Sequence, residues 1–263
     1  MKRQLTLLIG FIMFVNVIIA QSKDELATQL ANPVASLISV PFQSNFDYGV
    51  GPNEGFKYTL NAQPVIPVSI GENWNMISRT IVPIISQNDV IADGSSQSGM
   101  GDIVQSLFFS PKAPTPGGLV WGVGPVLMFP TATNSDVGLE KWAIGPTIVA
   151  LKLSETLIYG VLANHLVSYA GNEDRTDVNA TFFQPFISKT VGKGLSVSLA
   201  SENTQNWDAD LIFGFTGIYA NQIIRIRKQL IQVGGGPKMI YSNKSKTDWG
   251  FRINLVLLFP KSN

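Results

Sequence analysis

The sequence predicts an all-β fold: a transmembrane, up-and-down antiparallel β-barrel of about 12 strands with a short N-terminal helix or extension. Three observations support this prediction. Apolar and polar residues alternate with a period of two along most of the 263-residue chain, as in strands with one apolar face. Many of these segments exceed the roughly five or six residues usual in soluble sheets. Charged residues make up only 14% of the chain, against roughly 25% in an average soluble domain.

Residues 1–20 are expected to be a secretory signal peptide. The stretch "MKRQLTLLIGFIMFVNVIIA" has a basic start, an apolar centre and a small residue, Ala20, before polar Gln21. This layout predicts Sec export with cleavage after about Ala20. The alternative is an uncleaved anchor helix, but a spanning helix needs about 20 apolar residues and Asn16 interrupts this stretch.

Residues 21–35 are expected to form a periplasmic segment with a short helix near Lys23–Leu30. Ser22 can cap that helix because Glu25 follows three positions later, and Pro33 lies beyond its end. Within it, Lys23–Ala31 either plugs the periplasmic mouth of the barrel or hangs free, and the sequence leaves both arrangements open.

The barrel is expected to occupy residues 36–263. Tight links follow every second strand, whereas the other connections are generally longer and more polar. Such sorting is typical of strands that run up and down between a short-turn side and a long-loop side, with both termini on the short-turn side. The expected strands lie near residues 37–49, 55–70, 73–86, 100–111, 118–130, 139–152, 155–169, 178–190, 194–205, 209–224, 228–241 and 248–260.

The last of these strands shows the alternation most clearly. In "WGFRINLVLLF", from Trp249 to Phe259, every second residue is large and apolar. We expect this face to contact lipid, because a soluble β-sandwich, the alternative, usually has shorter strands and a charged exterior. Aromatic residues near strand ends are candidates for interfacial girdles, namely Trp74, Trp121, Trp142, Tyr159, Trp207 and Trp249.

Four prolines fall inside expected strands, where each removes a ladder hydrogen bond. They are Pro64, Pro125, Pro146 and Pro185. We expect local β-bulges at these positions.

Alternation also predicts which side chains line the lumen. Arg or Lys facing lipid at mid-membrane costs about 2–4 kcal/mol, so Arg79 and Arg252 are expected to point inward. For each candidate the alternative is a paired residue that only stiffens the barrel. The full set of lumen or solute-path candidates is Lys57, Thr59, Asn61, Gln63, Arg79, Asp102, Asn179, Glu202, Arg252 and Asn254.

The sequence predicts no enzyme, metal site or cofactor. His165 is the only histidine, and Ser168, the nearest downstream serine, falls on the opposite face of a strand. The carboxylates of "NEDRTD" lack calcium-loop spacing, and Cys is absent. Without its signal the chain has 17 of its 19 basic residues against 18 acidic ones, so nothing indicates nucleic acid as a partner.

Several stretches resemble a known family. "GMGDIVQSLFFSPKAPTPGGLVWGVGPVLMFPTAT", "EKWAIGPTIVAL", "YGVLANHLVSYAG" and "DVNATFFQPFIS" are similar to the outer-membrane transporters named for the meta-cleavage pathway of phenol degradation. Some members of that family carry the misleading label neuromedin U. The resemblance covers most of residues 30–260 and implies a Gram-negative outer-membrane barrel that admits small, often aromatic or hydrophobic, compounds. It supplies no substrate residues to carry over.

The functional prediction is therefore passive permeation of a small-molecule solute through a narrow lumen. The expected partners are outer-membrane lipid, the solute and the barrel-assembly machinery, for which Phe259 would provide the aromatic signal, since the chain ends "FPKSN". Two alternatives stay open: a non-conducting structural or adhesive barrel, and a secreted soluble β-sandwich that binds a ligand.

Overall fold

The computed structural model describes residues 22–244 and 248–260. The predicted signal peptide therefore lies outside the described residues. The elements, in chain order, are α1 (Lys23–Leu30), β1 (Ile38–Val50), β2 (Gly55–Ala62), β3 (Val65–Ser69), β4 (Trp74–Asn88), β5 (Ser96–Met100), β6 (Ile103–Pro111), β7 (Leu119–Phe129), the 3-10 turn η1 (Ser135–Val137), β8 (Lys141–Leu153), β9 (Leu157–Gly171), β10 (Asn179–Gly192), β11 (Leu195–Asn206), β12 (Leu211–Ile226), β13 (Gln229–Ser242) and β14 (Asp248–Phe259).

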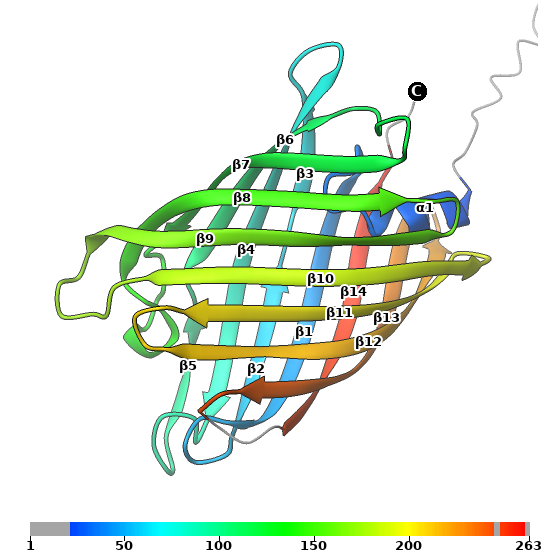
Figure 1. Ribbon diagram of the computed structural model, residues 1–263. Helices are drawn as coiled ribbons and strands as arrows, with labels where there is room; N and C mark the ends of the chain where they lie inside the picture. The colour runs from blue at the N-terminus through cyan, green and yellow to red at the C-terminus, as the bar shows by residue number, and fades with distance from the viewer. Residues whose placement is uncertain (1–21, 245–247, 261–263) are drawn as a thin grey trace, which may run out of the picture.

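The strands form one closed antiparallel barrel (Figure 1). Strands that follow one another along the barrel wall pair antiparallel, and β14 pairs with β1 from Ile38↔Phe259 to Asp47↔Gly250. Two of the 12 barrel strands are each in two pieces, β2 with β3 and β5 with β6. The predicted barrel is thus confirmed. The β-sandwich alternative is wrong, because a sandwich packs two sheets together whereas this sheet closes on itself.

The two faces of the wall differ as the alternation predicts. On β14, Trp249 is 58% exposed and Phe251, Ile253, Leu255 and Phe259 are also exposed, whereas Arg252, Val256 and Leu258 between them are buried. The exposed apolar side chains therefore cover the outside of the barrel. Such an outer surface is unfavourable in water and favourable in hydrocarbon.

Aromatic side chains gather near both rims of this apolar surface. At the short-turn end Trp74 meets Trp121 edge to face, with ring centroids 5.7 Å apart. At the long-loop end Trp142 meets Phe129 at 5.6 Å, and Trp249 stacks on Tyr48 at 4.6 Å. This arrangement matches the aromatic belts of proteins that lie across a membrane.

The helix α1 forms where the capping pattern predicts it. The Ser22 side chain accepts a hydrogen bond from the Glu25 amide at 3.1 Å, which satisfies one of the free amides of the first turn. In Figure 1, α1 lies at the end of the barrel where strand β14 ends. Among the described residues there is no helix with the length and apolar character needed to cross a bilayer.

The in-strand prolines do not form the predicted bulges. Pro64 separates β2 from β3, whereas the pairing register is unchanged on either side of Pro125, Pro146 and Pro185. Pro125 and Pro146 lie directly opposite each other on β7 and β8. The bulge prediction is wrong for these three prolines. A bulge would add one residue to a strand and shift its register, whereas here the register is constant and only the pairing beside the proline is interrupted.

Glycines before two of these prolines explain how the wall accommodates them. Pairing between β6 and β7 is interrupted beside Gly124, and pairing between β8 and β9 is interrupted beside Gly145. A Cβ on Gly124 would collide with the Leu107 carbonyl oxygen, and one on Gly145 with the His165 carbonyl oxygen. The neighbouring strand therefore approaches the bare Cα where proline has removed the donor.

Candidate functional site in the barrel lumen

The N-terminal segment 23–37 lies inside the short-turn end of the barrel. Leu26, Ala27 and Leu37 pack against the inward side chains of β12 and β14. We call this segment the plug. The predicted plugging arrangement, rather than the free one, is the one the structure has.

The plug also contacts the opposite wall. Val34 packs in an apolar cluster with fully buried side chains that include Ile77, Phe108 and Val149. This inner surface is apolar and not polar as the alternation had indicated for the lumen as a whole. The lumen candidates selected from the sequence are all polar or charged. Inward positions of β4 and β6–β9 instead carry Ile, Phe, Val and Leu, which pack in the same cluster as Val34 of the plug.

Two polar contacts fix the plug to β10 and to the turn that follows it. The Thr28 and Thr190 hydroxyl oxygens are 3.0 Å apart. The Asp24 carboxylate accepts a hydrogen bond from the Gly194 amide at 2.5 Å. At the other end of the plug, the Asn75 amide on β4 donates to the Ser36 hydroxyl at 2.7 Å. Apolar packing in two clusters accompanies these polar contacts.

A connected set of charged and polar side chains crosses the lumen farther from the plug. We call it the charged network: Asp47, Asn45, Lys238, Arg252 and Glu202. The Lys238 ammonium lies 2.7 Å from Asp47 and donates to the Asn45 side-chain oxygen at 3.0 Å. Arg252 donates to the same oxygen at 2.7 Å and to Glu202 at 2.8 and 3.5 Å.

The ring of Phe215 lies beside both cations of this network. The Lys238 ammonium lies 4.2 Å from the centroid of the Phe215 ring, and the Arg252 guanidinium lies 4.7 Å from it. Cation–π contacts of this kind add to the ion pairs. The side chains of Lys238 and Arg252 are 1% and 5% exposed, so both cations are held away from bulk water.

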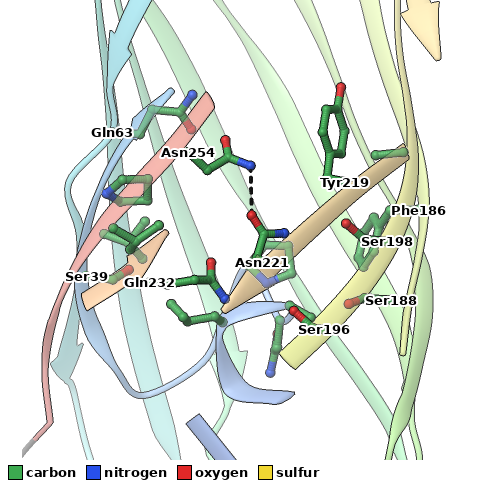
Figure 2. Close-up of a pocket in the computed structure, with 18 of the residues that line it drawn as sticks. Ser39, Gln63, Phe186, Ser188, Ser196, Ser198, Tyr219, Asn221, Gln232 and Asn254 are labelled. Atoms are coloured by element: carbon green, nitrogen blue, oxygen red, sulfur yellow. Dashed lines mark hydrogen bonds between the residues drawn. The ribbon is translucent and has the colours of Figure 1, made fainter. Parts of the chain in front are cut away.

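Between the plug and the charged network lies a cavity of about 240 Å³. Figure 2 shows Gln63, Asn254 and Gln232 on one side of it and Tyr219, Phe186 and Ser198 on the other. The Asn254 amide donates to the Asn221 side-chain oxygen at 3.1 Å, the dashed line in that view. The cavity is thus lined mainly by uncharged polar groups together with apolar side chains.

Most of the predicted lumen residues lie on the inward face. Arg79 donates to the Gln63 side-chain oxygen at 2.8 Å, and both residues border the cavity together with Glu202, Arg252 and Asn254. Lys57, Thr59 and Asn61 are placed inward by their pairing with Gln87, Ile85 and Pro83 on β4, since Ile85 and Gln87 are buried.

The structure places two candidates away from the cavity. The Asp102 carboxylate accepts hydrogen bonds from the Ala132 amide at 3.1 Å and the Leu139 amide at 2.5 Å, so it organises the connection between β7 and β8. Asn179 donates to exposed Asp208 at 2.9 Å at the strand end. Neither borders the cavity, because Asp102 directly precedes β6 and Asn179 begins β10, both at the long-loop side.

Asn45, Asp47 and Lys238 belong to the charged network although the sequence analysis did not select them. A signal was present for Asp47, which pairs with inward-facing Lys57 in the same hairpin. For Lys238 the signal was weaker, because Gly234, Gly235 and Gly236 precede it and give no alternation to read.

His165 lies in a setting unlike a hydrolytic site. Its Nδ1 is 2.9 Å from the Thr181 hydroxyl, and the Trp207 indole donates to that hydroxyl at 2.8 Å. Ser168 instead donates to Asp177 at 3.1 Å. Among the described residues there is also no group of three or more His, Cys, Asp or Glu that could hold a metal ion.

Comparison with known proteins gives structural similarity only. No family model and no curated protein sequence matches the chain. The COG4313 outer membrane channel from Pseudomonas putida F1 is similar in structure, with a TM-score of 0.65 and 13% identity over 85% of this chain and 94% of that one. The outer membrane phospholipase dimer of Salmonella typhi also matches, at a TM-score of 0.46 and 10% identity over 90% and 99%. The first comparison shows that the two chains share a barrel fold.

Proposed function

We propose that this chain is an outer-membrane channel that passively admits small, hydrophobic or aromatic molecules through a narrow lumen controlled by the plug. The apolar outer surface between two aromatic rims supports a membrane location. Sec export, the outer membrane as the destination and the barrel-assembly machinery as a partner belong to the same proposal. The likeness of the fold to the Pseudomonas putida channel supports it.

The observation that carries the proposal is the cavity between the plug and the charged network. A purely structural barrel of this size could fill its lumen with side chains, yet here about 240 Å³ is left between inward polar and apolar groups. Pockets that bind small organic molecules combine apolar walls with a few placed polar groups. The lumen therefore suits a solute with both kinds of surface.

A second candidate function is a barrel that conducts nothing. The observation that favours it is the buried packing of Leu26 and Val34 against opposite walls, which closes the short-turn end. The two functions differ in whether the plug leaves its seat, so the decisive experiment must control the plug.

A disulfide lock provides that control. The chain has no cysteine, so Thr28→Cys with Thr190→Cys places the only two thiols where the hydroxyls now lie 3.0 Å apart. We expect proteoliposomes with the oxidised variant to pass less solute than wild type, and dithiothreitol to restore passage. Liposome swelling with phenylacetamide and sugars measures the effect, and Thr28→Cys alone is the control.

The outcomes separate the two candidates. Flux that falls on oxidation and recovers on reduction supports a channel with a movable plug. Wild-type liposomes no more permeable than empty ones contradict the channel and favour the structural barrel. Migration of unheated and heated protein from outer-membrane fractions tests the location, because a folded barrel shifts on gels when it is boiled.

A further inference from the structure

The inward charges at mid-barrel do not balance. Asp47 is paired with Lys238 at 2.7 Å, and Glu202 with Arg252 at 2.8 Å. Within residues 22–244 and 248–260, Lys57 and Arg79 have no carboxylate oxygen within the 4.0 Å of an ion pair. Two inward cations therefore have no carboxylate at ion-pair distance among the described residues.

Only one of these two cations borders the cavity. Arg79 lies on its wall, whereas Lys57 does not. The contact of the Arg79 guanidinium is neutral: it donates to the Gln63 oxygen at 2.8 Å, while the Gln63 amide donates to Gln43 at 2.9 Å. Gln63 is 5% exposed, so this pair of amides holds the guanidinium in place.

A guanidinium held in this way favours an anion. Arginine offers five donors in a planar fork that matches a carboxylate, often through two parallel hydrogen bonds. Away from bulk water an unpaired charge is unfavourable, and an incoming anion relieves that cost. Glu202 borders the same cavity, but Arg252 donates to both of its oxygens, which offsets its repulsion of an anion.

Apolar side chains supply the other half of the site. Val65, Leu162 and Phe186 border the same cavity as Arg79. We propose that this cavity binds a small amphiphilic carboxylic acid, with its carboxylate on Arg79 and its apolar body against these three side chains. The inference rests on the proposed channel function and names the class of solute.

The test compares two isosteric probes, phenylacetate and neutral phenylacetamide. Both are titrated calorimetrically at pH 7 into the barrel in non-ionic micelles, with empty micelles as the blank. We expect wild type to bind phenylacetate roughly 10- to 100-fold more tightly, the range for hydrogen bonds to a charged group. Equal binding of the two probes by wild type overturns the proposal.

Two variants locate the preference. Arg79→Gln removes the charge, and Gln63→Glu keeps Arg79 but gives it a carboxylate partner within the chain. Both are expected to lose the preference for phenylacetate, and Gln63→Glu tests the site even if Arg79→Gln does not fold. Arg225→Gln, the same change at an exposed position outside the cavity, is expected to keep the preference. A preference retained by folded Gln63→Glu and Arg79→Gln contradicts the site.

Liposome swelling separates this inference from the channel. Passage of sugars without a phenylacetate preference in binding leaves the channel in place and overturns the anion site. A phenylacetate preference that both variants lose, in a barrel that passes no solute, supports the site and overturns the channel.

Discussion

The plug and the charged network occupy one lumen but are held by different forces. The plug is attached by apolar packing of residues such as Leu26 and Val34, which has no strict direction. The charged network depends on aligned donors and acceptors that connect β1, β11, β13 and β14. The difference indicates which part can move: apolar packing can separate and form again, whereas a separated buried pair leaves two charges unpaired.

Breaking the charged network is expected to have the largest effect. Glu202→Gln leaves the Arg252 side chain, 5% exposed, without a carboxylate partner. We expect it to lower the free energy of unfolding by about 3–5 kcal/mol, measured by urea unfolding in detergent micelles. The double variant Glu202→Gln with Arg252→Met removes both charges and is expected to recover much of the loss. A loss below about 1 kcal/mol, as for surface pairs, would show that water reaches the network.

Weakening the plug is expected to change opening rather than barrel stability. Leu26→Ala removes a 1% exposed side chain and should weaken plug docking by about 2–5 kcal/mol. The expected result is more frequent openings in planar bilayers with an unchanged urea midpoint. Leu199→Ala, on the exposed outer face, is the matched control. Parallel loss of the urea midpoint in Leu26→Ala would mean that plug and wall unfold together.

Glycines that precede a proline within a strand occur both beside the apolar cluster and beside the charged network. They therefore allow the same substitution to be compared in the two regions. Gly124 lies on β7, beside the apolar cluster, and Gly236 on β13, beside the charged network. A Cβ at either would strike a carbonyl oxygen of the neighbouring strand, Leu107 or Ile218. We therefore expect Gly124→Ala and Gly236→Ala to cost a similar amount, about 1–3 kcal/mol, in urea unfolding.

Gly71 provides the control for these substitutions. A Cβ there meets no atom within 4 Å, so Gly71→Ala should change stability by less than about 0.5 kcal/mol. A large difference between Gly124→Ala and Gly236→Ala would show that lumen packing, and not the backbone approach, sets the cost.

The smallest effect is expected at an ion pair between the first residue of β8 and the loop that follows β9. Asp177 accepts hydrogen bonds from Lys141 at 2.8 Å and Ser168 at 3.1 Å, and these bonds, Lys141 first, lower the pKa of the Asp177 carboxyl. A lowered folded pKa means that the stabilisation is present above the ordinary aspartate value of 3.8 and is lost as the pH falls through the lowered one.

Limited proteolysis of the loop measures this effect. Pepsin cleavage near residues 172–177 should increase modestly as the pH falls below the ordinary aspartate pKa. Asp177→Asn should show that susceptibility already at higher pH, because it lacks the charge that Lys141 pairs with. Identical pH profiles for the two proteins would mean that the pair does not order the loop.

Local pattern was enough to predict most of the wall. The alternation from Trp249 to Phe259 placed β14 and its outward face, and the Ser22 cap placed α1 at Lys23–Leu30. Strand and helix periods are set by backbone geometry, so neighbouring residues carry the information. The inward position of Lys57, Gln63 and Arg252 followed from the same period.

The site itself could be predicted only in part. The Lys238 ammonium and the Asn45 oxygen that accepts from it are 193 residues apart in sequence, and Arg252 and Glu202 are 50 apart. Alternation assigns a face but not the height at which two strands meet, and the ring has to close before β14 lies beside β1. The break at Pro64 and the skipped bonds at Pro125 likewise depend on the neighbouring strand.

The sequence by itself determined a membrane-suited barrel wall, a capped helix before it and a set of inward polar groups, because each follows from local periodicity. Only the tertiary structure decided that the helix enters the lumen, that apolar side chains of the plug cover β4, β6–β9, β12 and β14, and that Arg79 borders a cavity with no described carboxylate at ion-pair distance. Those outcomes depend on register and closure, which join residues far apart along the chain.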